Sequence, residues 1–255
     1  MTGPPILVFA GPSLPSAIRP GDPCLAWRPP AAAGDLLRLL RDPPDIVCLI
    51  DGYFDWRPAP WHKEILLLIE AGTRVLGAAS MGALRAAELD RHGMTGVGEI
   101  YRAYRSGMIC GDDEVALVHT LEDLGWKPVS EPMVDVRATL LSAVRAGIIS
   151  ADAARALRDS ARAIHFSERD WPAIVKLASW GGQGASGFSA WLATGIVRLK
   201  QADALRCLSS AVAERRPPSR RAAAPVPLTC FVKELAAECG VALRPSRQAR
   251  AAPDP

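Results

Sequence analysis

The first third of the chain contains three short, continuous apolar runs, each followed by glycine or serine. They span residues 6–10, 45–51 and 73–79. Runs of this kind are typical of strands buried on both faces, as in a parallel sheet. Residues 35–41, 61–70 and 80–93 instead place their apolar side chains on one side at helical spacing. This alternation predicts an α/β fold, a small open parallel sheet flanked by helices, of the doubly wound type.

No strand pattern is found between residues 132 and 216, and this region predicts an all-helical C-terminal part. Three or four amphipathic helices fit, roughly over residues 134–146, 151–164, 168–179 and 196–213. Ser150 and Ser167 have the position and the side chain of N-caps. The glycine-rich residues 181–184 predict a flexible linker rather than part of a helix.

Two further helices are predicted between these parts. One covers residues 99–106, and the other starts at the acidic residues 112–114, because acidic side chains favour a helix N-terminus. Leu117, Leu121 and Leu124 would form the apolar stripe of the second helix. We therefore expect an α/β core domain at residues 1–128, a helical domain at 129–216 and a flexible Pro/Arg-rich tail at 217–255. Within this tail, residues 230–235 could dock on the body.

Composition narrows the classes of function. The 255 residues are 49% hydrophobic with a net charge of +3, whose excess lies in the tail, so no nucleic-acid partner is expected. We also expect no membrane partner, because no apolar run approaches the roughly 20 residues that a membrane helix needs. The N-terminus does not resemble a secretion signal, and six scattered cysteines favour reduced thiols in the cytoplasm. Neither a metal site nor a cofactor is expected, because metal-ligand spacings and a phosphate-binding loop are absent from the sequence.

Ser80 stands where an apolar strand turns abruptly into a helix, with small residues on both sides. The spacing resembles the Gly-x-Ser-x-Gly turn that exposes a nucleophilic serine, with Ala78 in the first glycine position and Gly82 in the second. The alternative interpretation is a helix N-cap, for which serine is among the commonest residues. The fold favours a functional serine, because Ser13, Asp51 and Ser80 follow three successive predicted strands. Such strand ends share one edge of a parallel sheet, where ligands bind.

Acyl-transfer chemistry requires a nucleophile, a base and donors for an oxyanion. Ser80 would be the nucleophile, and free N–H groups of Met81 and Gly82 would bind the developing charge. His62 or His119 would be the base, oriented by one of the acidic residues Asp51, Asp113 and Glu114. The residues leave these choices open, and they also allow a site that only holds an anion.

Several longer motifs follow one another along the chain. They are Gly11-Pro12-Ser13-Leu14, Pro29-Pro30 with Gly34-Asp35-Leu36, Ile50-Asp51-Gly52-Tyr53-Phe54, Trp61-His62-Lys63-Glu64-Ile65, residues 77–89, Gly93-Met94 with Gly96-Val97-Gly98, Tyr104-Arg105 with Gly107, and Asp112-Asp113-Glu114-Val115-Ala116 with His119. Together these motifs resemble those of TfuA-like proteins. The resemblance covers roughly residues 6–120. It continues more loosely in the helical part, through residues 164–172 and 199–205.

The resemblance implies a role in peptide backbone thioamidation beside a YcaO-type enzyme. It further implies a ubiquitin-like sulfur-carrier protein with a C-terminal thiocarboxylate, whose hydrolysis would release sulfide for the YcaO partner during maturation of ribosomal peptides. The motif positions give the catalytic candidates Ser80, His62, His119 and Asp51, and the substrate-binding candidates Ser13, Lys63, Met81, Gly82, Arg85, Glu88 and Asp113.

Two other functions are considered. One is a non-catalytic adaptor that recruits or activates the YcaO enzyme through the aromatic residues Tyr53, Phe54, Trp56 and Trp61. The other is an unrelated small-molecule hydrolase, which is disfavoured because no predicted strands follow Ser80 to carry its remaining catalytic residues.

Overall fold

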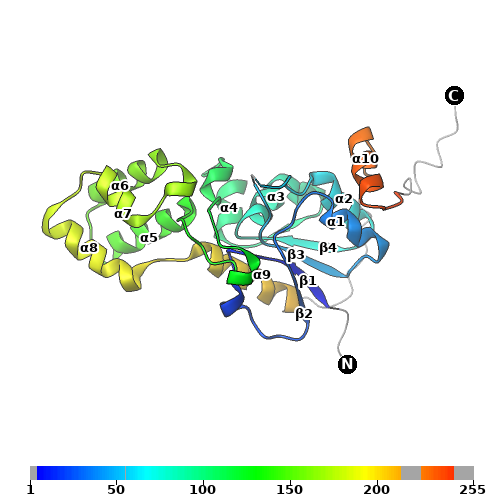
Figure 1. Cartoon of the computed structure of the whole chain (residues 1–255), viewed down its shortest axis with the longest axis horizontal. Helices are drawn as coiled ribbons and strands as arrows, with labels where there is room; N and C mark the ends of the chain where they lie inside the picture. The colour runs from blue at the N-terminus through cyan, green and yellow to red at the C-terminus, as the bar shows by residue number, and fades with distance from the viewer. Residues whose placement is uncertain (1–4, 55, 214–224, 244–255) are drawn as a thin grey trace.

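The computed structural model describes residues 5–54, 56–213 and 225–243. Five parallel strands form one sheet in the order β2-β1-β3-β4-β5 (Figure 1). They are β1 (Ile6–Phe9), β2 (Leu25–Arg28), β3 (Ile46–Leu49), β4 (Arg74–Gly77) and β5 (Thr95–Gly96). The α-helices are α1 (Asp35–Arg38), α2 (His62–Glu70), α3 (Met81–Leu89), α4 (Glu99–Arg105), α5 (Met133–Arg145), α6 (Ala151–Ala163), α7 (Trp171–Leu177), α8 (Gly182–Gly195), α9 (Leu199–Ala213) and α10 (Cys230–Glu238). The predicted fold class is confirmed.

Both faces of the sheet are buried, as the continuous apolar runs predict. Successive side chains of a strand point to opposite faces. On one face, side chains such as Val47 pack against Leu36 of α1, Ile65 of α2 and Ala86 of α3. On the other face, side chains such as Cys48 pack against Cys207 and its neighbours on α9. The helix that completes the sheet therefore comes from the C-terminal part of the chain (Figure 1).

The strand order places a topological switch point between β1 and β3. From β1 the chain moves outward to β2, whereas from β3 it moves in the opposite direction to β4. Connections that leave adjacent strands in opposite directions open a crevice at the strands' carboxyl ends, and ligands of open α/β sheets bind there. Residues that directly follow β1 and β3 therefore lie at the expected ligand site.

Two strands were not predicted. Strand β2 lies among prolines and forms one edge of the sheet, where burial decreases from Leu25 to the exposed Arg28. Strand β5, at the other edge, is two residues long. Edge strands combine buried and exposed positions, so they lack the continuous apolar pattern of the central strands.

The predicted helix from residue 112 to 124 is wrong. The structure has two short 3₁₀ turns, Asp112–Glu114 and Glu122–Leu124, joined by an irregular segment with a bridge between His119 and Pro128. The leucine stripe is not a buried face, because Leu121 and Leu124 are exposed. Backbone hydrogen bonds, such as the one that Val129 N–H donates to Val118 O, hold this segment instead.

The helical part packs around its own core, which includes Leu140 of α5, Leu157 of α6, Ile174 of α7 and Phe188 of α8. Ser150 caps α6 as predicted, accepting a hydrogen bond from Ala153 N–H. Ser167 does not cap α7, because Asp170 occupies that position and accepts from Ala173 N–H.

The predicted linker at residues 181–184 is wrong, because helix α8 begins at Gly182. Burial of Phe188 and Leu192 stabilises this helix despite the low intrinsic helix propensity of glycine. No helix in the described ranges is long and apolar enough to cross a membrane.

Helix α10 packs on the core, as suggested for residues 230–235. Val232 and Ala236 contact Leu37 and Leu67 in a small apolar cluster, and the Arg41 guanidinium donates to Cys239 O. Other parts of the predicted tail, residues 217–224 and 244–255, lie outside the described residues. The domain boundaries at 128 and 216 stay a prediction.

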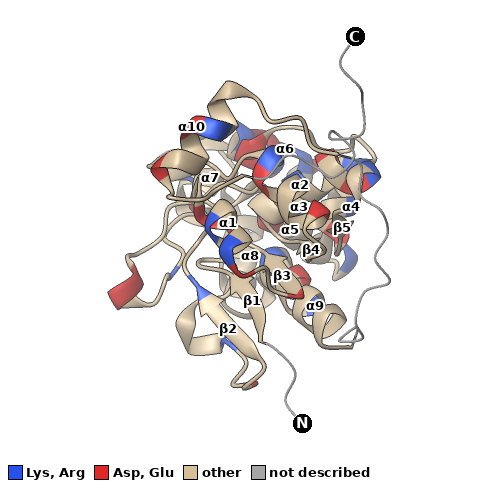
Figure 2. Ribbon diagram, turned by 90° about the vertical axis from the view of Figure 1, so that its right-hand side faces the viewer, with Lys and Arg blue, Asp and Glu red and all other residues tan. Residues whose placement is uncertain are grey.

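In Figure 2, basic and acidic residues occur together on several helices, including α6, which carries the Arg155–Asp152 ion pair. Other ion pairs join the two parts of the chain. Arg137 of α5 binds Glu114 through two hydrogen bonds of 2.9 and 2.7 Å. The buried Arg169 donates to Asp113 O. The turn at residues 112–114 is therefore held by the helical part.

Candidate functional site

A cavity of about 990 Å³ lies at the carboxyl edge of the sheet. Pro12, Pro30, Asp51 and Ser80, which line it, follow β1, β2, β3 and β4. Its other walls come from residues 52–54, 56–57, 115–119, 121–123 and 126, from residues 165–167 and from Lys200 of α9. The cavity thus occupies the place where the switch point predicts a ligand site.

Asp51 organises the crevice between β1 and β3. It is buried and accepts hydrogen bonds from Gly11 N–H at 2.8 Å, Ser13 N–H at 3.0 Å and the Ser13 hydroxyl at 2.7 Å. These bonds fix the loop after β1 against the loop after β3. The predicted convergence of Ser13 and Asp51 is therefore present, and their direct contact had no sequence signal.

Ser80 stands at a strained turn between β4 and α3. Its side chain is 2% exposed, lines the cavity and does not cap the helix. The preceding residue, Ala79, has φ +66°, which residues with a Cβ seldom adopt. Strained residues of this kind cluster at functional sites. Ser80 thus occupies the N-cap position without using its hydroxyl as a cap, so this hydroxyl is available to the cavity.

The start of α3 crowds against β3. A Cβ at Gly82 would overlap Leu49 O, so only glycine fits here without displacement. Gly82 N–H donates to Ile50 O at 3.1 Å, so the prediction that this group is free is wrong. Among the described residues, Met81 N–H has no backbone acceptor. Of the two N–H groups expected to bind an oxyanion, Met81 N–H therefore remains.

Lys200 is a cavity residue that the sequence did not predict as functional. Its side chain is 3% exposed, and its Nζ donates to Val115 O at 2.6 Å. Burial lowers the pKa of the Lys200 amine, whereas the nearby carboxylates Asp51 and Asp135 oppose this shift. A lysine with a lowered pKa can serve as a proton acceptor. The motif around residue 199 was the available signal, but 120 residues separate Lys200 from Ser80.

His119 also lines the cavity. Its Nδ1 lies 2.8 Å from Thr120 O, and its ring contacts Trp126 at a centroid distance of 5.2 Å. Because a carbonyl oxygen can only accept, this contact assigns the proton to Nδ1 and leaves Nε2 as the acceptor of the neutral ring. Trp126 has φ +61°, so a second strained residue adjoins this cavity.

The remaining predicted residues lie elsewhere. His62, Lys63, Arg85, Glu88 and Asp113 are not among the described residues that line the cavity. The Glu88 carboxylate accepts from His62 Nε2 at 2.8 Å and from Arg85 at 2.7 Å, so these three form a partly exposed cluster. Lys63 Nζ donates to Pro227 O. Of the two histidines proposed as the base, only His119 shares the cavity with Ser80.

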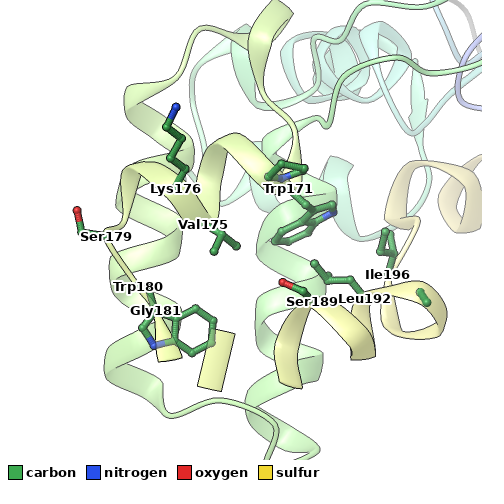
Figure 3. A pocket seen from close by; sticks show the side chains of 11 residues that line it. Trp171, Val175, Lys176, Ser179, Trp180, Gly181, Ser189, Leu192 and Ile196 are labelled. Carbon is green, nitrogen blue, oxygen red and sulfur yellow. The ribbon is translucent and has the colours of Figure 1, made fainter. Parts of the chain in front are cut away.

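A second cavity, of about 630 Å³, lies between α7 and α8 in the helical part. Figure 3 shows its apolar walls, including Trp171, Val175, Trp180 and Leu192, with the Lys176 ammonium and the Ser179 hydroxyl turned outward. It contains none of the predicted site residues. Within the described ranges, no group of three or more His, Cys, Asp or Glu side chains is placed to hold a metal ion.

Comparison with known proteins finds one family for the middle of the chain. Residues 51–170 match the model of the family described as TfuA-like protein. The match confirms the resemblance noted in the sequence, and the chain carries a TfuA-like region, of a family associated with YcaO-dependent thioamidation. This region contains Asp51, Ser80 and His119, whereas Lys200 lies beyond it. A comparison with curated proteins finds no match.

Proposed function

We propose that this protein hydrolyses the C-terminal thiocarboxylate of a ubiquitin-like sulfur-carrier protein and supplies the released sulfide to a YcaO-type enzyme. The observation that carries this proposal is the presence of an uncapped, buried serine and a buried lysine in one cavity at the switch point. Serine–lysine pairs form one of the known variants of the serine nucleophile and its base.

In the proposed reaction, the Ser80 hydroxyl attacks the carbonyl carbon of the thiocarboxylate while the neutral Lys200 amine accepts its proton. Met81 N–H stabilises the oxyanion of the tetrahedral intermediate. Collapse breaks the C–S bond, and the proton held by Lys200 passes to the departing sulfur, which leaves as hydrosulfide. Water then attacks the Ser80 ester with Lys200 again as base, which yields the carrier carboxylate and restores the serine.

The test is sulfide release from a thiocarboxylated carrier protein. The wild-type protein should release sulfide, whereas Ser80→Ala and Lys200→Met should lower the rate by at least about 10³-fold, the usual scale for loss of a nucleophile or base. Ser189→Ala, an exposed serine of α8 beside the second cavity, is the matched control and should keep full activity.

The variants also separate the alternatives for the base. If Lys200→Met retains activity and His119→Asn loses it, His119 takes the role assigned to Lys200. Full activity of Ser80→Ala would contradict the nucleophile assignment.

A second candidate function is a non-catalytic adaptor that recruits or activates the YcaO enzyme. It is favoured by the exposed aromatic side chain of Trp56, which is 92% exposed beside Tyr53 and Phe54 at the cavity. Large exposed aromatic residues often anchor protein interfaces. For an adaptor, the wild-type protein alone releases no sulfide, and YcaO activity depends on a stoichiometric complex that Trp56→Ala weakens.

A further inference from the structure

Lys200 is held at both its backbone and its side chain. It is the second residue of α9, where a helix leaves its N–H groups without internal acceptors. The Lys200 N–H donates to Asp135 Oδ1 of α5 at 3.0 Å, so a buried carboxylate from another helix caps this position. At the other end of the side chain, Nζ donates to Val115 O.

The second contact also depends on α5. Val115 directly follows the turn at residues 112–114, and Arg137 of α5 fixes that turn through its paired hydrogen bonds to Glu114. Asp135 and Arg137 are separated by one residue on the same helix. One helix of the helical part therefore secures the backbone of Lys200 directly and the acceptor of its ammonium group through Glu114.

We propose that Asp135 is a positioning residue of the site: by accepting the Lys200 N–H at the start of α9, it holds the Lys200 side chain in the cavity. This inference rests on the proposed function only for its consequence in catalysis. Its physical content, the coupling of Asp135 to Lys200, holds whether or not the protein is a hydrolase.

Charged groups on the elements around Lys200 support this assignment. Asp51, after β3, and Asp135, on α5, are the two carboxylates that favour the charged amine. Others are paired: Glu114 with Arg137, and Asp203 of α9 with Arg206. Titratable groups elsewhere on the cavity wall are His119, Glu122, Asp123 and His165.

The test follows the Lys200 amine directly by NMR. The chain has five lysines, Lys63, Lys127, Lys176, Lys200 and Lys233, so a protein labelled with ¹³Cε-lysine gives few resonances, and Lys200→Met assigns the one of interest. Asp135→Asn keeps the oxygen that accepts the Lys200 N–H and removes the charge. The titration midpoint of Lys200 should move to lower pH, because the buried amine loses one of the two carboxylates that favour its charged form.

Two controls frame this result. Asp51→Asn should move the midpoint in the same direction and further, because Asp51 is the stronger of the two carboxylates acting on Lys200. Asp152→Asn, on the exposed side of α6, should leave it unchanged. An unchanged Lys200 midpoint in a folded Asp135→Asn protein would overturn the proposal.

If Asp135→Asn does not fold, Asp135→Glu tests the same contact, because the longer side chain keeps the charge but moves the carboxylate from its place beside the Lys200 N–H. A changed Lys200 midpoint would support the proposal, and an unchanged one would overturn it. Where thiocarboxylate hydrolysis is measurable, the acid limb of the kcat/KM profile should move with the NMR midpoint in Asp135→Asn. Absence of hydrolysis in the wild type would refute the proposed function. The NMR midpoints would still decide the role of Asp135, because they do not depend on catalysis.

Discussion

Glu64 provides the sharpest test of the physical reasoning, because a single buried carboxyl group connects two helices. It is 0% exposed, and its oxygens accept from Gly34 N–H at the start of α1 and from Trp61 N–H at the start of α2. Burial nevertheless raises the pKa of Glu64 from 4.5 to about 7, although its backbone hydrogen bonds oppose the shift.

The sign of the effect follows from proton linkage. The folded protein holds the Glu64 proton more tightly than the unfolded chain, so the free energy of unfolding decreases as pH rises through the window between the two pKa values. With pKa values of 4.5 unfolded and about 7 folded, this group lowers the free energy of unfolding by about 2.5 kcal/mol between pH 5 and pH 8.

The assay is urea unfolding of the wild-type protein and Glu64→Gln at several pH values between 5 and 8. Glutamine does not titrate, so the difference between the two proteins isolates Glu64 from Asp135 and other groups. We expect the stability of the wild type relative to the variant to fall steadily across this range. A difference that stays flat would mean that the N–H donors balance the effect of burial on the Glu64 pKa, and one that rises with pH would mean that they outweigh it; either result contradicts this prediction.

Three further predictions address the turn, the caps and the cavity mouth. Gly82→Ala should lower the free energy of unfolding by about 1–3 kcal/mol or more in urea titration, because its Cβ overlaps Leu49 O; a neutral effect would mean that α3 shifts freely. Ser150→Ala and Asp170→Ala should each lower it by about 1 kcal/mol, and Ser167→Ala by much less, because only the first two cap their helices; equal losses for all three would contradict the capping assignment. Trp56→Ala should leave the thermal midpoint unchanged but, if the carrier docks at the cavity, raise KM for the carrier several-fold with kcat unchanged; an unchanged KM would remove Trp56 from the carrier-binding surface.

The central fold was predictable because β1 and β3 are continuous runs of apolar residues, without polar positions between them. Strand β2 escaped prediction because an edge position mixes buried Leu25 with exposed Arg28 among prolines. The helix expected after residue 112 failed for a different reason. Its leucines have helical spacing, but Leu121 and Leu124 face solvent. Backbone hydrogen bonds between residues 118–120 and residues 127–130 hold the segment instead. The period of the apolar residues shows which structure is possible, whereas tertiary contacts decide which structure forms.

The candidate site was predictable where topology alone brings residues together. Ser13, Asp51 and Ser80 follow strands, and parallel strands carry such residues to one edge. Lys200 follows no strand, and its place depends on how α9 packs across the sheet and on its contact with Asp135. His62 was indistinguishable from His119 in sequence, yet it pairs with Glu88 outside the cavity.

The covering of one sheet face by α9 has a consequence for how the protein is made. A nascent chain that has emerged only as far as α8 already contains β1, β3 and β4, but Ile6, Val8 and Cys48 still lack their partners on α9. Those contacts join the N-terminal strands to a helix that begins at residue 199, so they close late and slowly during synthesis. A truncated product that ends before residue 199 would display a bare apolar sheet, the kind of surface that chaperones bind and that promotes aggregation.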